Sequence, residues 1–573
     1  MNDPILSLRD SVGEAVQAGL AKLEIPQEHR NLPLEAPPEG MGDIAVPCHR
    51  LAKLLRRNPV EIAKSLDAAI GQSALFTHAP AGPYVNFTFD SQKMARATLE
   101  ALAELRDRYG TLPPKGLRVI LEHTSVNPTD RLSVGRGRNP IIGDTLARIM
   151  RAAGYSVETQ YYVDDMGRQA AMKTLAVRHG QTYQWAAAAT GEREGESPGD
   201  PALKEELASL VSGAEHGDKA VIDEMIRICS NVMGETISPT LRRIGAEVDS
   251  YVSESKFVVD GSVGRTLDAL RGGGLPDENG ALYIDLENHG ISGRSSKYFL
   301  SRTDGTSLYA ARDVAYHQWK LSRCDRAVNV LGEDHKLEAK GVEIGLRLLG
   351  SEKVPEVLFY AFVSLPEGKM STRAGRVVLL DDLLDEAIVR AQAEVEKRRP
   401  ELPEDKKREI ATAVGIASVR YNIVRVQAEK PMVFKWEEAL NFEGCSAPFI
   451  QYAHARACSI LARASNERPA PPPSGRAEAG SIPSVLESGE TRLVRAIAQM
   501  PSVVSKCAED KTPHALASYA LQLASEFNQF YRDCPVITAE PEVREFRIAL
   551  AVGARWALAS ALGMLGLAAP AEM

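Results

Sequence analysis

A short apolar run, a glycine-rich turn and a long helical pattern follow one another in the first third of the chain. Residues 119–121 (VIL) have the composition of a buried strand, and residues 127–139 (NPTDRLSVGRGRN) supply the turn. Apolar residues then recur at helical spacing as far as Ala153, and Gly154 stands where a helix would end. A strand, a glycine turn and a helix in this order bring backbone N–H groups and a helix N-terminus to a phosphate or an adenine. The segment therefore predicts a nucleotide-binding α/β fold.

The chain is too long for a single core. At 573 residues, a prior of about 150 residues per domain predicts three or four domains. Residues 1–110 read as a small α/β domain, and residues 111–385 alternate strands and helices, with an insertion around 170–260. Helical periodicity dominates residues 386–573. We therefore expect a doubly wound parallel, Rossmann-type sheet between a small N-terminal α/β domain and an all-helical C-terminal domain.

Composition narrows the class of protein. The residues are 44% hydrophobic and 25% charged, as in soluble globular proteins. No apolar run approaches the ~20 residues that span a bilayer, and the N-terminus is no signal peptide, so we expect a cytoplasmic protein without membrane contact. The seven cysteines include no CxxC pair, which argues against a zinc module, and we expect no protein-bound metal. A net charge of −8 argues against a general nucleic-acid coat but allows a local basic face.

A second motif follows the predicted sheet, at residues 367–375 (EGKMSTRAG). Lys369 and Arg373 flank Ser371 and Thr372 there, which gives a loop two cations for a triphosphate. The alternative is an ordinary basic surface loop, and only the position after the sheet favours the functional interpretation.

The two motifs belong to a longer series that resembles the arginyl-tRNA synthetases, which are class I aminoacyl-tRNA synthetases. The resemblance covers nearly the whole chain. Its motifs are NPT and VGRGR within residues 127–138, IGD at 142–144, YYVDDMGRQ at 161–169, LYAARDVAY at 308–316, GEDH at 332–335 and EGCSAPFIQYAHAR at 443–456.

A pocket for arginine needs a carboxylate, because the guanidinium is planar and never deprotonates. Asp313 and Glu122 are the candidates, and Tyr309 lies one helical turn before Asp313 on the same face. The alternative makes Asp313 a solvated helix residue and Tyr309 a core aromatic. The resemblance implies that Tyr309 and Asp313 hold the guanidinium. It also implies that Ser125 and Asn127 line the amino-acid site, and we expect His335 to line the substrate site as well.

The resemblance implies an ATP site at the two motifs. Two positions depart from the family pattern, because Ser133 and Arg136 stand where two histidines usually contact ATP. We expect Lys369, Arg373 and Arg136 to be catalytic by neutralising charge on the phosphates, with Mg²⁺ arriving on the phosphates of ATP. The expected ATP-binding residues are Ser133, Val134, Gly135, Arg136, Gly137, Lys369, Met370 and Ser371.

The helical C-terminal domain carries interleaved aromatic and basic residues. Tyr531 and Arg532 could stack on splayed anticodon bases, or they could be plain core and surface residues. The resemblance favours tRNA binding there and a tRNA contact by the N-terminal domain. The expected function is that of an arginine–tRNA ligase, a monomer that uses arginine, ATP and its tRNA and needs bound tRNA for the first step. A paralogue with a different acceptor and a catalytically silent tRNA-binding protein are the alternatives.

Overall fold

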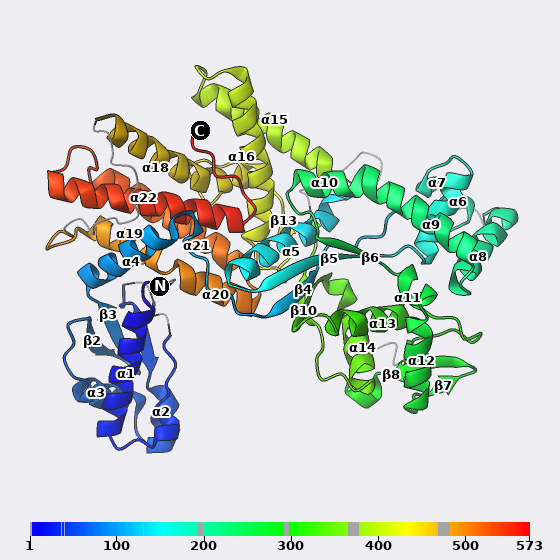
Figure 1. Ribbon diagram of the computed structural model, residues 1–573, viewed down its shortest axis with the longest axis horizontal. Coiled ribbons are helices and arrows are strands. Elements are labelled where there is room, and N and C mark those ends of the chain that lie inside the picture. The colour runs from blue at the N-terminus through cyan, green and yellow to red at the C-terminus, as the bar shows by residue number, and fades with distance from the viewer. Residues whose placement is uncertain are drawn as a thin grey trace.

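The computed structural model describes residues 3–35, 37–38, 40–129, 131–192, 199–291, 297–364, 378–467 and 482–573. A five-stranded parallel sheet lies at the centre, with a small domain at the N-terminus and a helical domain at the C-terminus (Figure 1). The expected fold class is thereby confirmed.

The N-terminal domain packs helices on an antiparallel sheet of three strands in the order β1-β3-β2. Gly42 shows why glycine is needed there, because its φ is +104° and an added Cβ would lie 2.6 Å from the Phe87 carbonyl oxygen. Its neighbour Asp43 accepts from Phe89 N and from Arg495 Nε, which ties this domain to the helical domain. The elements are α1 (Leu6–Lys22), β1 (Ile44–Pro47), α2 (His49–Leu55), α3 (Pro59–Ala69), β2 (Phe76–Ala81), β3 (Tyr84–Phe89) and α4 (Ser91–Leu105).

The central sheet has the strand order β11-β10-β4-β5-β6, and every neighbouring pair is parallel. The first strand of the sheet, β4, is the middle one. The chain then adds β5 and β6 on one side of it and later β10 and β11 on the other, so the strand order reverses between β4 and β10. The sheet and its main helices are β4 (Arg118–Glu122), α5 (Val134–Ala152), β5 (Ser156–Val163), β6 (Ser250–Ser253), α13 (Tyr309–Leu321), β10 (Arg326–Gly332), α14 (Lys336–Leu348) and β11 (Glu356–Tyr360).

Two excursions leave the sheet. The first, between β5 and β6, is helical. It comprises α6 (Arg168–Arg178), α7 (Tyr183–Ala189), α8 (Pro201–Glu215), α9 (Lys219–Val232), a π-helical turn (Met233–Ile237) and α10 (Ser238–Arg243). The second, between β6 and α13, has no counterpart in the sequence-based expectations. It consists of α11 (Ser255–Val259), α12 (Ser262–Gly272) and the antiparallel strands β7 (Asp277–Glu278), β8 (Ala281–Asp285) and β9 (Lys297–Phe299).

The described part of the C-terminal domain is helical apart from β13 (Met432–Val433), which pairs with β12 (Val363–Ser364). Its helix α22 is long and apolar enough to cross a membrane by length and composition, but 56% of its most apolar window is buried inside the protein. It therefore serves as a core helix. The helices are α15 (Leu380–Arg398), α16 (Glu404–Val424), α17 (Trp436–Ala439), α18 (Ala447–Glu467), α19 (Ser488–Ala498), α20 (Met500–Asp510), α21 (Pro513–Asp533) and α22 (Pro541–Met564).

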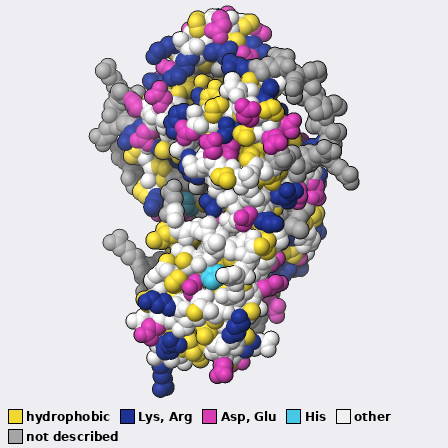
Figure 2. Space-filling view, turned by 90° about the vertical axis from the view of Figure 1, so that its left-hand side faces the viewer, with side chains coloured by type: hydrophobic (Ala, Val, Ile, Leu, Met, Phe, Trp, Pro, Cys, Tyr) yellow, Lys and Arg dark blue, Asp and Glu magenta, His cyan; other side chains and the backbone are white. Residues whose placement is uncertain are grey.

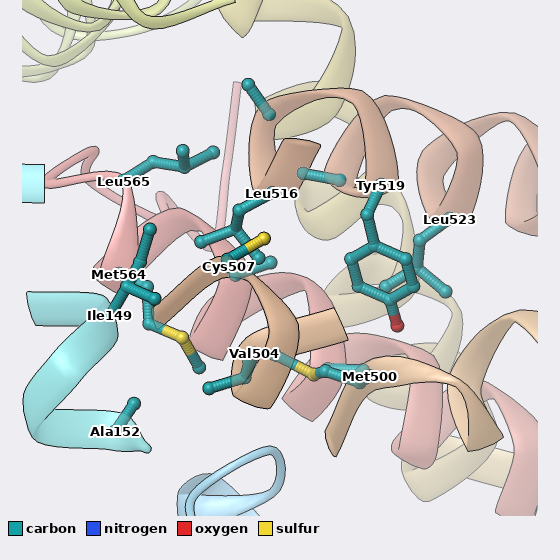
Figure 3. Close-up of a cluster of buried hydrophobic side chains, with 14 of the residues drawn as sticks. Ile149, Ala152, Met500, Val504, Cys507, Leu516, Tyr519, Leu523, Met564 and Leu565 are labelled. Carbon is teal, nitrogen blue, oxygen red and sulfur yellow. The ribbon is translucent and has the colours of Figure 1, made fainter. Parts of the chain in front are cut away.

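Helix α5 joins the sheet to the helical domain. Figure 3 shows Ile149 and Ala152 at its C-terminal end, in one apolar cluster with Met500, Val504 and Met564 of the helical domain. On the sheet side, an added Cβ at Gly143 would lie 2.3 Å from the Cβ of His123. The glycine in mid-helix therefore lets α5 lie directly against the end of β4.

Candidate active site

A cavity of about 320 Å³ opens beside the carboxyl ends of β4 and β10, where the strand order reverses. Ligands bind at such a position in open α/β sheets. Glu122 ends β4, Asp313 lies on α13 and His335 precedes α14, and all three line this cavity. Three of the six residues expected to bind arginine are thereby brought together.

A chain of buried hydrogen bonds runs along one wall of the cavity. Lys320 Nζ lies 2.7 Å from Glu122 Oε2 and 2.7 Å from Asn329 Oδ1. Asn329 Nδ2 lies 2.7 Å from His317 Nε2, and His317 Nδ1 lies 2.8 Å from the Asp313 carbonyl oxygen. Burial lowers the pKa of His317 to about 4, so the imidazole is neutral and can accept from Asn329 while donating to the carbonyl.

Glu122 is already matched by a cation. Burial works to raise the pKa of its carboxyl, but the Lys320 ammonium outweighs this and the pKa is lowered. The carboxylate is therefore ionised, and it forms an ion pair with Lys320 at 2.7 Å. Of the two carboxylates expected to hold a guanidinium, Glu122 has the smaller charge left to offer.

Asp313 is in the opposite situation. Burial, followed by the nearby charges of Glu122 and Glu338, raises the pKa of its carboxyl to about 7. Among the described residues, none forms a hydrogen bond with its carboxyl group, and no Lys, Arg or His forms an ion pair with it. A cationic ligand would stabilise the ionised form of this buried carboxyl, so Asp313 is the group in the cavity best suited to bind a guanidinium.

The other three residues of the expected amino-acid site, Ser125, Asn127 and Tyr309, are not among those that line this cavity. Ser125 Oγ donates to Glu122 Oε1 at 3.0 Å and accepts from Tyr162 N at 3.1 Å, with φ at +39°. A non-glycine residue in this region of backbone conformation is strained, and such strain gathers at functional sites. Asn127 is half-buried two residues further on, and Tyr309 opens α13 with 50% of its surface exposed.

The glycine turn leads into α5 as expected, but Ser133 has a structural role there. It is the N-cap residue, and its Oγ accepts from Arg136 N at 3.4 Å. Val134 N donates to the Val378 carbonyl oxygen at 3.0 Å. These two backbone N–H groups are therefore engaged within the chain. Arg136 is exposed and its side chain has no hydrogen bond or ion pair among the described residues.

The segment with Lys369, Met370, Ser371 and Arg373 lies outside the described residues, but its two flanks are described and both meet the glycine turn. Before it, an added Cβ at Gly135 would lie 4.0 Å from the Val363 carbonyl oxygen. After it, Leu379 forms a β-bridge with Ser133. The two described flanks of the second motif, more than 200 residues after the glycine turn, therefore both lie at the start of α5.

A larger cavity of about 1500 Å³ lies in the helical domain. Tyr531 and Arg532 both line it, with Tyr531 40% exposed. The Arg456 guanidinium lies 4.6 Å from the Tyr452 ring centre and 5.1 Å from that of Tyr531. The other lining residues with basic or aromatic side chains are Arg398, Arg399, Arg463, Phe442 and Phe449. On the face shown in Figure 2, basic side chains lie in both the upper and the lower part, with acidic side chains among them.

Sequence reasoning missed several residues of the smaller cavity. Lys320 and His317 carry a signal that could have found them, because they follow Asp313 by seven and four residues and so share its helix face. Glu338 and Asn329 had no such signal. As for metals, a search of the described residues finds no group of three or more His, Cys, Asp or Glu that could hold an ion.

Comparisons with known proteins identify the family to which the chain is similar. Three family models match: "Arginyl tRNA synthetase N terminal domain" over residues 10–89, "tRNA synthetases class I (R), catalytic domain" over 100–436 and "DALR anticodon binding domain" over 450–573. The arginine–tRNA ligase of Methanocella arvoryzae is 47% identical over 91% of this chain and 92% of its own. That of Methanothermobacter thermautotrophicus is 41% identical over 98% of each.

A solved structure gives the same result. The arginyl-tRNA synthetase of Thermus thermophilus superposes with a TM-score of 0.81 at 29% identity, covering 99% of this chain and 100% of its own. Family models match more than half of the chain, and relatives above 40% identity span almost all of it. The chain therefore belongs to the arginyl-tRNA synthetase family of class I aminoacyl-tRNA synthetases.

Proposed function

We propose that this protein is an arginine–tRNA ligase, which activates arginine with ATP and transfers it to the terminal adenosine of its tRNA. The observation that carries the proposal is the cavity at the strand-order reversal. This cavity is lined by Asp313, whose carboxyl lacks a cationic partner among the described residues. The cavity lies at the carboxyl edge of the sheet, and the glycine turn starts from the same edge.

In this proposal the guanidinium of arginine binds Asp313, with Tyr309 one helical turn before it on α13 and His335 in the cavity lining. Glu122, held by Lys320 and Ser125, fixes the floor. Ser125 and Asn127, on the turn after β4, take the α-amino and carboxylate end. That end would then point toward the start of α5.

The first chemical step is attack by the carboxylate of arginine on the α-phosphate of ATP, with pyrophosphate as the leaving group. The attacking group is already an anion, so no general base is required. Arg136 is exposed at the first turn of α5, where a permanent cation can fork two donors onto a phosphate. Val134, Gly135 and Gly137 let the nucleotide approach the backbone, Ser133 holds the turn, and Mg²⁺ enters with ATP.

The segment 365–377 would supply the remaining cations, Lys369 and Arg373, with Met370 and Ser371 beside the nucleotide. Support comes from its flanks, since both meet the glycine turn. Charges placed there would meet the negative charge that develops on the phosphates in the transition state.

For tRNA we propose that the large cavity of the helical domain receives anticodon bases, with Tyr531 as a stacking surface and Arg532 near the phosphates. The N-terminal domain would contact another part of the tRNA. We also propose that the protein is monomeric and cytoplasmic. Its three domains would comprise residues 1–110, 111–385 and 386–573.

The structure offers a route by which tRNA binding could influence activation. Helix α5 starts at the glycine turn and ends in the apolar cluster of the helical domain (Figure 3). Between these ends Arg138 donates to the carbonyl oxygens of Lys430 at 2.9 Å and Gln427 at 3.1 Å. A shift of the helical domain would thus reach the ATP turn through one rigid helix.

Arginine-dependent exchange of pyrophosphate into ATP, measured with and without tRNA, tests this function. We expect exchange with arginine only when tRNA is present, and arginyl-tRNA as the final product. Exchange without transfer to tRNA would point to a paralogue with a different acceptor. No exchange in either condition, with tRNA still bound, would point to a silent tRNA-binding protein.

A further inference from the structure

The residues that lead into α15 support the glycine turn from one side. The backbone of residues 378–380 runs antiparallel to that of residues 132–134, where Val134 N donates across the pair at 3.0 Å and Leu380 N at 2.8 Å. Leu380 is fully buried, and an added Cβ at Gly137 would lie 2.9 Å from its side chain. The start of α5 and the start of α15 therefore lie in direct contact.

Asp381, the next residue of α15, is held by α10, the last helix of the excursion between β5 and β6. Thr240 Oγ1 donates to Asp381 Oδ2 at 2.6 Å, and Arg243 Nη1 donates to Asp381 Oδ1 at 2.8 Å. Thr240 is 1% exposed and the Asp381 side chain is 22% exposed, so this contact is largely shielded from water. Both oxygens of one carboxylate thus accept from the same short helix.

A π-helical turn, Met233–Ile237, directly precedes α10 and separates it from α9. Such turns are rare and occur frequently at functional sites. Thr240 Oγ1 lies 3.1 Å from the carbonyl oxygen of Thr236, so the hydroxyl that holds Asp381 also contacts this irregular turn. The two buried residues of the turn lie in the same apolar core as Leu380. The excursion is therefore joined to the start of α15 both by polar contacts and by packing.

We propose that Asp381 is a positioning residue for the glycine turn, and that through it the excursion between β5 and β6 sets the backbone that receives ATP. Asp381 holds residues 378–380 in place, and these hold residues 132–134 through backbone hydrogen bonds. The carboxylate itself does not contact the nucleotide. Position matters at such a turn, because a displacement of about 1 Å can slow a reaction by about 10²-fold. The inference rests on the proposed function, since it assumes that the turn binds ATP.

The test compares Asp381→Ala with the matched variant Asp385→Ala. Asp385 also pairs with Arg243, one helical turn later on α15, but its side chain is 68% exposed. From the side of the excursion, Thr240→Val removes the hydroxyl that holds Asp381 and Thr240→Ser restores it. Asp381→Asn keeps an oxygen that can accept from Thr240. Thermal midpoints verify that each variant is folded.

Two kinds of measurement are made on each enzyme. KM for ATP, KM for arginine and kcat are measured in the presence of tRNA. Hydrogen exchange of the backbone amides of residues 132–137 is measured by mass spectrometry without ligands. The exchange rates report whether the turn is held in place, and they do not depend on catalysis.

We expect Asp381→Ala and Thr240→Val to lower kcat/KM for ATP by about 10-fold to 10²-fold, while KM for arginine stays within about twofold. Amide exchange in residues 132–137 should rise by about tenfold in both variants. Asp385→Ala and Thr240→Ser should resemble the wild type, and Asp381→Asn should recover part of the loss. The double variant Asp381→Ala with Thr240→Val should lose no more than the worse single variant, because both changes break one contact.

Amide exchange and ATP kinetics within about twofold of the wild type in Asp381→Ala would overturn the inference. So would equal losses in Asp381→Ala and Asp385→Ala, since these would reflect the charge around Arg243. Equal losses for ATP and for arginine would also overturn it, because they would show a general loss of structure. If the wild type showed no arginine-dependent exchange of pyrophosphate, the proposed ligase function would fail. Amide exchange would still decide whether Asp381 holds the glycine turn.

Discussion

Arg420 on α16 donates to Asp144 on α5 at 2.6 Å, and both side chains are buried where the sheet meets the helical domain. The same guanidinium donates to the Leu565 carbonyl oxygen at 3.1 Å. Gly566 follows with φ at +70°, and an added Cβ there would lie 2.0 Å from Arg420 Nη2. Three segments far apart in the sequence, including the end of the chain, therefore meet at one ion pair.

Loss of Arg420 should be severe, because Arg420→Met leaves the buried Asp144 carboxylate without its fully buried partner. We expect a destabilisation of about 3–5 kcal/mol. The control is Arg148→Met, because Arg148 also pairs with Asp144, at 2.8 Å, but is partly exposed. That change should cost about 1 kcal/mol or less. Urea midpoints of the two variants check the prediction, and similar losses in both would contradict it.

Arginine binding should depend on pH through Asp313. Its pKa is raised to about 7 by burial and then by Glu122 and Glu338. A guanidinium binds the ionised carboxylate, so binding releases a proton and strengthens as pH rises through 7. KM for arginine should therefore be about tenfold higher at pH 6 than at pH 8.

Asp313→Asn provides the control for this pH effect. It should weaken arginine by about 2–5 kcal/mol and abolish the slope, because no titrating carboxyl remains. His335 is another titratable group at the cavity, so His335→Gln must also be measured, and it should keep the slope. A slope that survives in Asp313→Asn would assign the proton to another group.

The sequence predicted those parts of the fold and site that depend on local periodicity. The strand, glycine turn and helix of residues 118–152 followed from apolar spacing, and Tyr309 and Asp313 lie on one face of α13 as the four-residue interval requires. These features need only neighbours in the sequence. For the same reason, the strands of the second excursion were missed, since they are short and gain stability from tertiary packing.

Charge pairing could not be predicted in this way. Glu122 was expected to hold a guanidinium because of its residue type, but its charge is met by Lys320, 198 residues away. Ser133 was expected to replace a histidine at ATP, and the structure shows that it caps α5. A serine just before a helix is itself a capping signal, so this role could have been recognised from the sequence.

Lys369 should be required for the chemical step, although it lies outside the described residues. Lys369→Ala should slow adenylate formation by about 10²–10³, as expected for loss of one preorganised cation at a transition state. The tRNA affinity should change little, and Lys369→Arg should restore part of the rate. Pre-steady-state adenylate formation measures this, and a loss below about threefold would mean that another cation acts on the phosphates.

Arg136 and Ser133 should differ in effect, because the Ser133 hydroxyl caps α5 whereas the Arg136 side chain makes no hydrogen bond or ion pair with any other described residue. Arg136 is exposed without a partner among the described residues, so Arg136→Ala should raise KM for ATP and lower kcat, together by about 10² in kcat/KM. Ser133→Ala should cost about 1 kcal/mol of stability through loss of the cap and leave ATP use nearly unchanged. Ser133→Asn, which can still cap, should keep the wild-type thermal midpoint.

Because arginine does not titrate near neutrality, KM for ATP between pH 6 and 8 should show no step that Arg136→Ala removes. Equal, small effects of both alanine variants on ATP use would show that neither side chain contacts the nucleotide, and the cation at the phosphates would then have to come from residues 365–377.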